Sequence, residues 1–214
     1  MCYSYRTSLI AYTIVMLSAF FALYTGQYII GMLILFYGQI QLSEALIWKG
    51  LDDGNTTLNK IGTNYGKYTL PSHVFAIGLG ILLATKGKSF IPLVIGIFSY
   101  ITVVSFCYDN SKNELTYPLD PNCKKECQNN DNRLQWPFYN GELWYGCLCI
   151  IGFIFVCMYL PAPLKIMITM ILAITYLCSF LFYKNNTKSL ASVWCFSSAI
   201  IAPIIVLLGY YLSR

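Results

Sequence analysis

Residues 27–48 read QYIIGMLILFYGQIQLSEALIW, an apolar run long enough to cross a membrane as one helix, because the hydrocarbon layer takes about 20 residues. The run carries one charged side chain, that of Glu44. Tyr37, Gln41, Glu44 and Trp48 follow one another at intervals of four, three and four residues. In a helix this spacing places them on one narrow stripe, so we expect the stripe to face protein or water rather than lipid.

The rest of the chain has the same apolar character. Its 214 residues are 57% hydrophobic and 11% charged, which is more apolar surface than one soluble core of this size would bury. We therefore predict an all-α polytopic membrane protein, a single domain over residues 1–214 that forms a bundle of about seven transmembrane helices. The expected spans are Thr7–Tyr24, Gln27–Trp48, Leu70–Thr85, Ser89–Cys107, Gly141–Leu160, Pro163–Tyr183 and Leu190–Leu212.

Two long polar segments separate some of these spans, at about 49–69 and 108–140, and we expect both to be loops. With an odd number of spans, both loops and the segment 184–189 lie on the same side of the membrane as the N-terminus. We call this the N-side. The turns on the opposite side are short, and the basic residues in or next to them are Lys86, Lys88 and Lys165.

Two features predict that the N-side is extracellular or lumenal and that the C-terminus is cytoplasmic. Basic residues in short loops mark the cytoplasmic side of a membrane. The N-side also carries N-x-Thr sequons at Asn55 and Asn185, which are glycosylation candidates only in a lumenal compartment. A plain total of Lys and Arg favours the opposite orientation, because most basic residues lie in the longer N-side segments.

The chain has nine cysteines, and several lie inside predicted spans, where a thiol behaves as a small apolar group. Cys107, Cys123 and Cys127 lie at or in the second N-side loop, and they are disulfide candidates if that side is oxidising. Zinc binding is the alternative for this group. It would need further ligands, and the chain has one histidine. We expect neither a metal site nor a cofactor.

Polar and aromatic residues gather at the N-side ends of several predicted spans. Glu44 could simply be an acid anchored at the membrane interface near Lys49, with Trp48 as a belt residue. Against that reading, a carboxylate inside a membrane costs about 2.5–3.5 kcal/mol, and Gln41 extends the stripe inward. We therefore expect a ligand-binding pocket at this depth. Its candidate residues are Tyr37, Gln41, Glu44, Trp48, His73, Glu142, Trp144, Trp194 and Cys195.

Three short motifs resemble those of a known family. MCYSYRTS at residues 1–8, QIQLSEALIWKG at 39–50 and SVWCFSSA at 192–199 are similar, in this order, to motifs of an uncharacterised family of bacterial seven-span membrane proteins. That family opens with MCFSATAS, has Q-x-x-E-G-x-x-W in its second span and Trp-Cys in its last. The resemblance marks as signature positions Cys2, Gln41, Glu44, Trp48, Trp194 and Cys195.

The resemblance implies a seven-span fold but no reaction, because the function of the family is unknown. The sequence departs from the family pattern at Ala45, where the family has Gly, and its first turn lacks the Arg-rich stretch that orients the bacterial members. The amino-acid composition of the chain, rich in Lys, Asn, Ile and Tyr, is typical of a protein from an AT-rich genome such as that of a protist or a large DNA virus.

Three functions are consistent with these residues. The first is binding or transport of a small polar or cationic ligand, with Glu44 as counter-charge and aromatic rings as cation–π partners. The second is a membrane-embedded enzyme in which Cys2 is the thiol nucleophile or redox group, with Glu44 and His73 beside it. The third is a structural role with a Cys2–Cys195 disulfide. The expected partner is the lipid bilayer, nucleic acid is excluded by the lack of a basic stripe, and the oligomeric state stays open.

Overall fold

The computed structural model describes residues 4–110, 115–118, 134–137, 142–183 and 187–212. Within these ranges it describes no side chains for residues 106–110, 135, 142–146 and 187–198, nor for part of 172–183. The described chain is almost entirely helical, which confirms the all-α prediction. Its elements are α1 (Tyr5–Tyr24), α2 (Tyr28–Asp52), α3 (Thr56–Thr69), a 3₁₀ turn (Leu70–Ser72), α4 (His73–Ala84), α5 (Ile91–Asn110), β1 (Tyr117–Pro118), β2 (Leu134–Gln135), α6 (Glu142–Tyr159), α7 (Ala162–Tyr183) and α8 (Thr187–Leu212).

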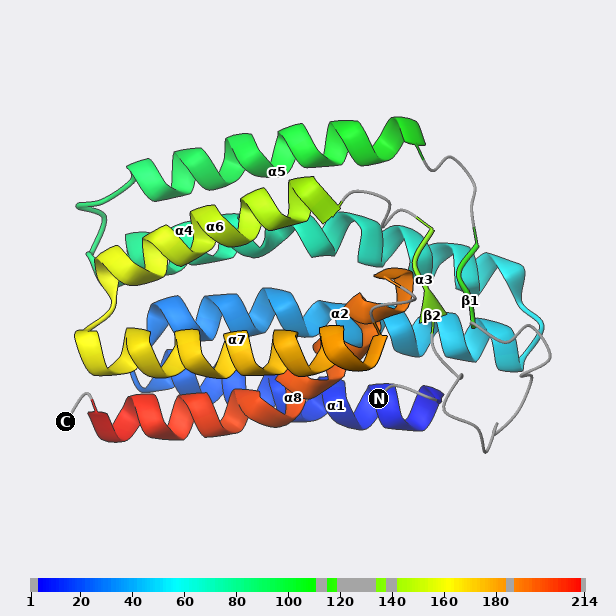
Figure 1. Cartoon of the computed structure of the whole chain (residues 1–214), viewed down its shortest axis with the longest axis horizontal. Helices are drawn as coiled ribbons and strands as arrows, with labels where there is room; N and C mark the ends of the chain where they lie inside the picture. Colours follow the sequence, from blue (N-terminus) through cyan, green and yellow to red (C-terminus); the bar gives the residue numbers. More distant parts are fainter. Residues whose placement is uncertain (1–3, 111–114, 119–133, 138–141, 184–186, 213–214) are drawn as a thin grey trace.

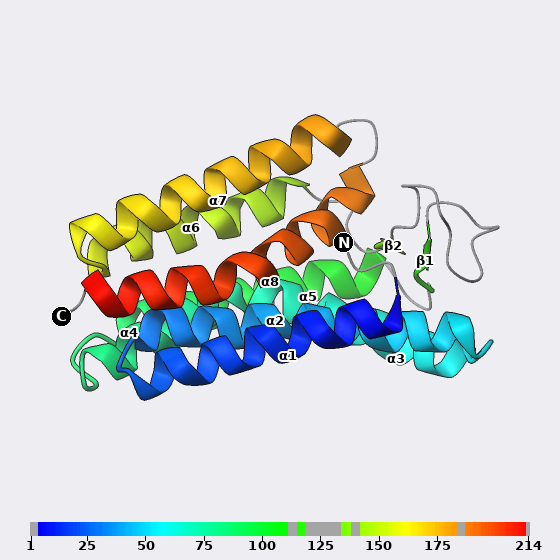
Figure 2. The same cartoon turned by 90° about the horizontal axis from the view of Figure 1, so that it is seen from below.

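The helices lie side by side along the long axis of the molecule, and consecutive legs run in opposite directions (Figures 1 and 2). The turn between α2 and α3 and the strand pair β1–β2 lie at one end, which is the N-side end, and the C-terminus lies at the other. Helix α2 packs against α1, α3, α4 and α8. It is therefore the central helix of the bundle, and it is the one that carries the stripe around Glu44.

The predicted loop at 49–69 is wrong in the structure. Helix α2 continues to Asp52, and α3 covers Thr56–Thr69 and joins α4 through the 3₁₀ turn, so that 56–84 form one helical leg. The Asn55 side chain caps α3 by accepting the Leu58 N–H at 3.0 Å. Polar residues suggested a loop, but those of α3 line one side of an amphipathic helix.

Small residues allow α3 to approach α2 closely. A Cβ atom at Gly62 would lie 2.9 Å from both the Ile47 N and the Ser43 O, so only glycine fits there without moving backbone. Gly50 also lies close to α3, because a Cβ atom at this position would lie 2.6 Å from the Asn59 N. Such small-residue contacts are typical of helix pairs in membranes.

Three helical legs of the described chain are long and apolar enough to cross a membrane: α1, α2 and the leg Thr56–Ala84. Shorter apolar helical stretches are Ile91–Ser105, Cys147–Tyr159, Ala162–Ile171 and Ala199–Leu212.

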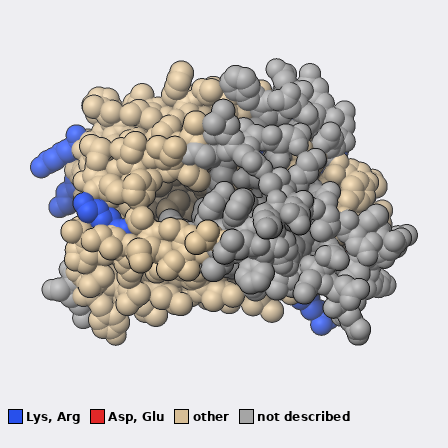
Figure 3. Space-filling view, viewed as in Figure 1, with Lys and Arg blue, Asp and Glu red and all other residues tan. Residues whose placement is uncertain are grey.

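The surface and the interior have unusual compositions for a water-soluble protein. Large apolar side chains are exposed along α1, α5, α6, α7 and α8, among them Leu17, Phe98, Met158, Ile166 and Tyr211. The described part of the face seen in Figure 3 is accordingly mostly uncharged, with basic side chains at the left edge and at the lower right of the view. Buried polar residues include Ser8, Gln41, Ser43, Glu44, Asn59, Thr63, Lys67 and Thr116.

Candidate functional site

The stripe on α2 lies in the interior of the bundle. Gln41 and Glu44 have no exposed surface, and Trp48 is 4% exposed. Tyr37, nearer the middle of the helix, is half-buried. The stripe is enclosed because α2 is packed on several sides by α1, α3, α4 and α8. A carboxylate and an amide are thus held side by side, one turn apart, away from the surface of the molecule.

His73 lies against this stripe. It is the first residue of α4, directly after the 3₁₀ turn, and its ring packs on that of Tyr37 with 4.9 Å between centroids and 35° between planes. The 3₁₀ turn sets this position, with the Ser72 Oγ donating to the Thr69 O at 2.6 Å. The structure therefore brings together His73 and Tyr37, two residues that lie on different predicted spans.

Apolar residues flank Glu44 along α2. Ile40 lies one turn before it and Trp48 one turn after it, and both belong to a buried cluster that also contains Leu134 and Trp136. The other buried members of the cluster are Ile47 and Leu70. The Glu44 carboxyl group is consequently buried on a helix face where apolar side chains lie one turn away on either side.

Trp136 reaches this position through a groove in α3. A Cβ at Gly66 would lie 2.4 Å from the Cζ3 of Trp136 and 2.6 Å from the Ser43 Oγ, so the indole occupies the space that a larger residue would fill. The Ser43 Oγ donates to the Gly62 O at 2.6 Å, which ties α2 to α3 beside the indole.

A second set of polar contacts holds β1 against α3. Asn59 and Thr63, one turn apart, bind the backbone of Thr116, which has no exposed surface. The Asn59 Nδ2 donates to the Thr116 O at 2.8 Å, and the Thr116 N–H donates to the Asn59 Oδ1 at 3.1 Å and to the Thr63 Oγ1 at 3.2 Å. The two threonine hydroxyls are 2.8 Å apart. We call Asn59 and Thr63, which hold Thr116, the Asn59 clamp.

Sequence reasoning missed the clamp and Trp136. Asn55, Asn59, Thr63 and Lys67 recur every four residues, which is the pattern of a polar stripe on a helix. Gly62 and Gly66 show the small-residue spacing of a close helix contact. Both signals were present in the sequence, but they fell in the segment that was predicted to be a loop.

Several predicted site residues have no described surroundings. Glu142 and Trp144 lie on α6, Trp194 and Cys195 on α8, and Cys107 on α5, but their side chains are outside the description. The following residues lie outside the described ranges altogether: Cys2, Cys123, Cys127 and Asn185. Asn55 is exposed at the turn between α2 and α3, where its amide oxygen caps α3.

The described cysteines lie on α6. Cys147 and Cys149 are exposed and Cys157 is partly buried, and Cys147 and Cys157 form no disulfide. Their positions on an apolar helix agree with thiols acting as small apolar groups. Among the residues that the structure describes, no three His, Cys, Asp or Glu side chains come together as a metal site would require.

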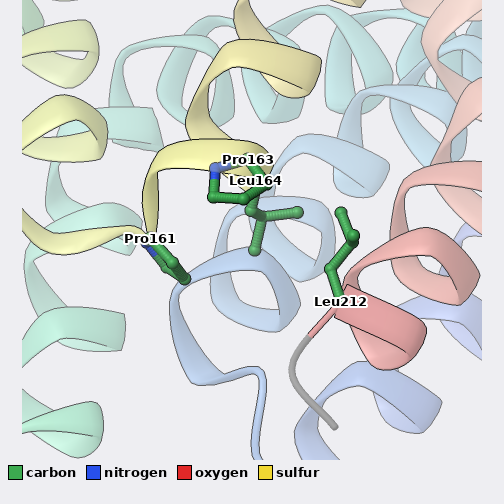
Figure 4. Close-up of a pocket in the computed structure, with 4 residues that line it drawn as sticks. All are labelled: Pro161, Pro163, Leu164 and Leu212. Carbon is green, nitrogen blue, oxygen red and sulfur yellow. The ribbon is translucent and has the colours of Figure 1, made fainter.

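A shallow apolar hollow lies far from the stripe. It is lined by Pro161, Pro163 and Leu164 at the turn between α6 and α7 and by Leu212 at the end of α8 (Figure 4). This is the end of the bundle at which the C-terminus lies. The hollow has no polar side chain to orient a ligand, so we assign it no chemistry.

Comparison with protein-family models, with curated proteins and with solved structures finds no match to this chain. The resemblance to the bacterial seven-span family stays a prediction from the three motifs.

Proposed function

We propose that this chain is an integral membrane protein with seven transmembrane helices that binds a small polar or cationic ligand in the bundle interior beside Glu44. The observation that carries the proposal is the complete burial of Glu44 and Gln41 on the central helix. An ionisable residue inside a membrane bundle is costly to keep, and such residues commonly line substrate or ion pathways.

The helical legs support the transmembrane part of the proposal. Three of them meet the length and hydropathy of a span, and α5, α6, α7 and α8 expose large apolar side chains along their outer faces. At 1.5 Å per residue, the 25 residues of α2 extend about 37 Å, more than the roughly 30 Å of hydrocarbon. The last turns of α2 and the first turns of α3 then project into the headgroup region on the N-side, which we place outside the cell or in a lumen.

The chemistry of the stripe favours a cation or a polar amine as ligand. Glu44 supplies a counter-charge, Gln41 supplies an amide that both donates and accepts hydrogen bonds, and Tyr37 supplies a π face. His73, stacked on Tyr37, adds a ring nitrogen that can take part in a hydrogen bond. The burial of Glu44 and Gln41 on α2 and the packing of His73 on Tyr37 support this role.

A stabilisation screen tests the proposal. The protein in lipid nanodiscs is heated with members of a panel of small amines, quaternary ammonium ions and inorganic cations, and unfolding is followed by tryptophan fluorescence. We expect at least one compound to raise the unfolding temperature in a concentration-dependent way, because a ligand that binds only the folded state stabilises it.

The matched variants are Glu44→Gln and Asp53→Asn. Both remove one carboxylate near the end of α2, but Asp53 is exposed and pairs with Lys49 at 3.1 Å on the same helix. The Glu44→Gln variant should lose the ligand-induced shift and Asp53→Asn should keep it. An equal shift in both variants, or none in the wild type across the panel, refutes the proposal.

Replacing Cys2 by Ser separates the remaining functions. A ligand site beside Glu44 keeps its ligand-induced shift in Cys2→Ser. A thiol enzyme loses turnover while its unfolding temperature stays the same, and a Cys2–Cys195 bridge would show itself as a lower unfolding temperature.

A further inference from the structure

The strand pair β1–β2 is fixed to the bundle at two separate places. At one place the Asn59 clamp binds both backbone groups of Thr116, directly before β1. At the other, Leu134 of β2 and Trp136 pack into the cluster that contains Ile40 and Trp48 of α2. The two strands pair with each other, Tyr117 opposite Gln135 and Pro118 opposite Leu134, so a hold on β1 is also a hold on β2.

The apolar part of this unit belongs to the same buried cluster as the α2 residues that flank Glu44. Leu134 has no exposed surface and Trp136 is 3% exposed, so both are inserted rather than resting on the surface. Ile40 and Trp48, which flank Glu44 by one turn on either side, belong to the same cluster. Leu134 of β2 and Trp136, which follows β2, are therefore packed in the same cluster as the residues on either side of Glu44.

The clamp itself is polar and buried. Asn59 is 2% exposed and Thr63 is 2% exposed, and the contacts to Thr116 use both the N–H and the C=O of its backbone. Without these partners, two backbone groups would be left buried and unsatisfied, which is costly and would favour release of β1 from α3. A purely apolar contact between β1 and α3 would carry no such penalty.

We infer that Asn59 and Thr63 are positioning residues for the Glu44 site: by holding Thr116 they keep Leu134 and Trp136 over Glu44 and so limit access to it from the N-side. The inference rests on the proposed function, because access to Glu44 matters for ligand binding only if the ligand binds beside Glu44. Its physical content, that the clamp controls how exposed Glu44 is to water, can be tested without any ligand.

Carbodiimide labelling measures this exposure. The protein in nanodiscs is treated with a water-soluble carbodiimide and an amine nucleophile, and the rate of modification of Glu44 is read by peptide mass spectrometry. The exposed carboxylate of Asp53 in the same helix serves as internal reference. We expect Glu44 in Asn59→Ala and Thr63→Val to react at least about tenfold faster, relative to Asp53, than in the wild type.

Two controls isolate the clamp from general loosening. Asn64→Ala removes an exposed asparagine that directly follows Thr63 on the same helix, and Thr63→Ser keeps the hydroxyl. Both should label Glu44 within about twofold of the wild type. If Asn59→Ala does not fold, Thr63→Val alone decides, because it preserves the volume of the side chain and leaves Asn59 in place.

The opposite results overturn the inference. Labelling of Glu44 in Thr63→Val within twofold of the wild type would show that the clamp does not limit access. An equal increase in Asn64→Ala would show that any change in α3 loosens the bundle. Neither result bears on ligand binding, which the stabilisation screen tests separately with Glu44→Gln.

Discussion

At the scale of single residues, the local sequence determines which helix face carries Glu44, and the packing of the bundle determines how deeply Glu44 is buried. Its spacing from Gln41 and Trp48 was visible in the sequence and predicted a stripe facing protein or water. The extent of its burial could not be predicted, because it depends on α2 being surrounded by four other helices and on residues near 134–136 that are distant in the sequence.

Asn55 provides a first prediction at this scale. Its side chain caps α3, and it is also the acceptor of a glycosylation sequon whose threonine is Thr57. Asn55→Ala removes cap and sequon, and Thr57→Ala removes the sequon alone. We expect Asn55→Ala to lower the free energy of unfolding by about 1 kcal/mol relative to Thr57→Ala, measured by thermal unfolding of protein without glycan. Equal stabilities would show that the cap contributes nothing to the fold.

Tyr37 provides a second residue-scale prediction. Tyr37→Phe keeps the ring that packs on His73 at 4.9 Å, whereas Tyr37→Leu removes it. Because an aromatic pair contributes about 0.5–1.5 kcal/mol beyond its buried area, Tyr37→Leu should unfold at a clearly lower temperature than Tyr37→Phe. The two variants would unfold together if the contact with His73 carried no energy.

At the scale of elements, the pair α2–α3 shows what hydropathy can and cannot predict. The predicted span Leu70–Thr85 corresponds to the 3₁₀ turn and α4, because these residues are continuously apolar. The helix that precedes it, α3, was predicted as a loop. It is polar on average and is stabilised by a cap, by glycine contacts with α2 and by the Asn59 clamp, and a search for long apolar runs detects none of these.

The close contact between α2 and α3 leads to a prediction for Gly62. A Cβ there meets backbone atoms of Ile47 and Ser43 at 2.9 Å, which can move only if the helices separate. Gly152, by contrast, would meet only the flexible end of Ile77, at 3.1 Å. Gly62→Ala should therefore destabilise the protein by about 1–3 kcal/mol, and Gly152→Ala should be neutral or stabilising through helix propensity. Chemical unfolding in mild detergent compares the two.

A result in which both variants are equally stable would contradict the close packing of α2 and α3. It would also mean that this end of the bundle is not rigid enough to hold Trp136 against Gly66.

At the scale of the whole molecule, alternating helical legs place the start of α1 in the same half of the bundle as the α2–α3 turn and the strand pair (Figure 1). The orientation in the membrane is a separate matter, because it depends on the charges of the turns and on the insertion machinery rather than on packing.

Native lysines test the orientation. Lys49 and Lys60 lie at the N-side end, on α2 and α3, and Lys86 and Lys88 lie in the exposed turn between α4 and α5. With a membrane-impermeant amine reagent on intact cells, we expect Lys49 and Lys60 to be modified and Lys86 and Lys88 to be protected until the membrane is opened. The reverse pattern would invert the orientation, and modification of all four in sealed cells would contradict a membrane-spanning bundle.

The central claim, a ligand site built around a buried carboxylate, is tested most directly by equilibrium binding in nanodiscs. The compound that stabilises the wild type most is titrated into wild type, Glu44→Gln and Asp53→Asn. Loss of a desolvated charge pair typically costs 2–5 kcal/mol, so the account predicts an affinity at least about thirtyfold weaker in Glu44→Gln and unchanged in Asp53→Asn. Equal affinities in the wild type and Glu44→Gln would contradict it, because the ligand would then be bound elsewhere on the molecule.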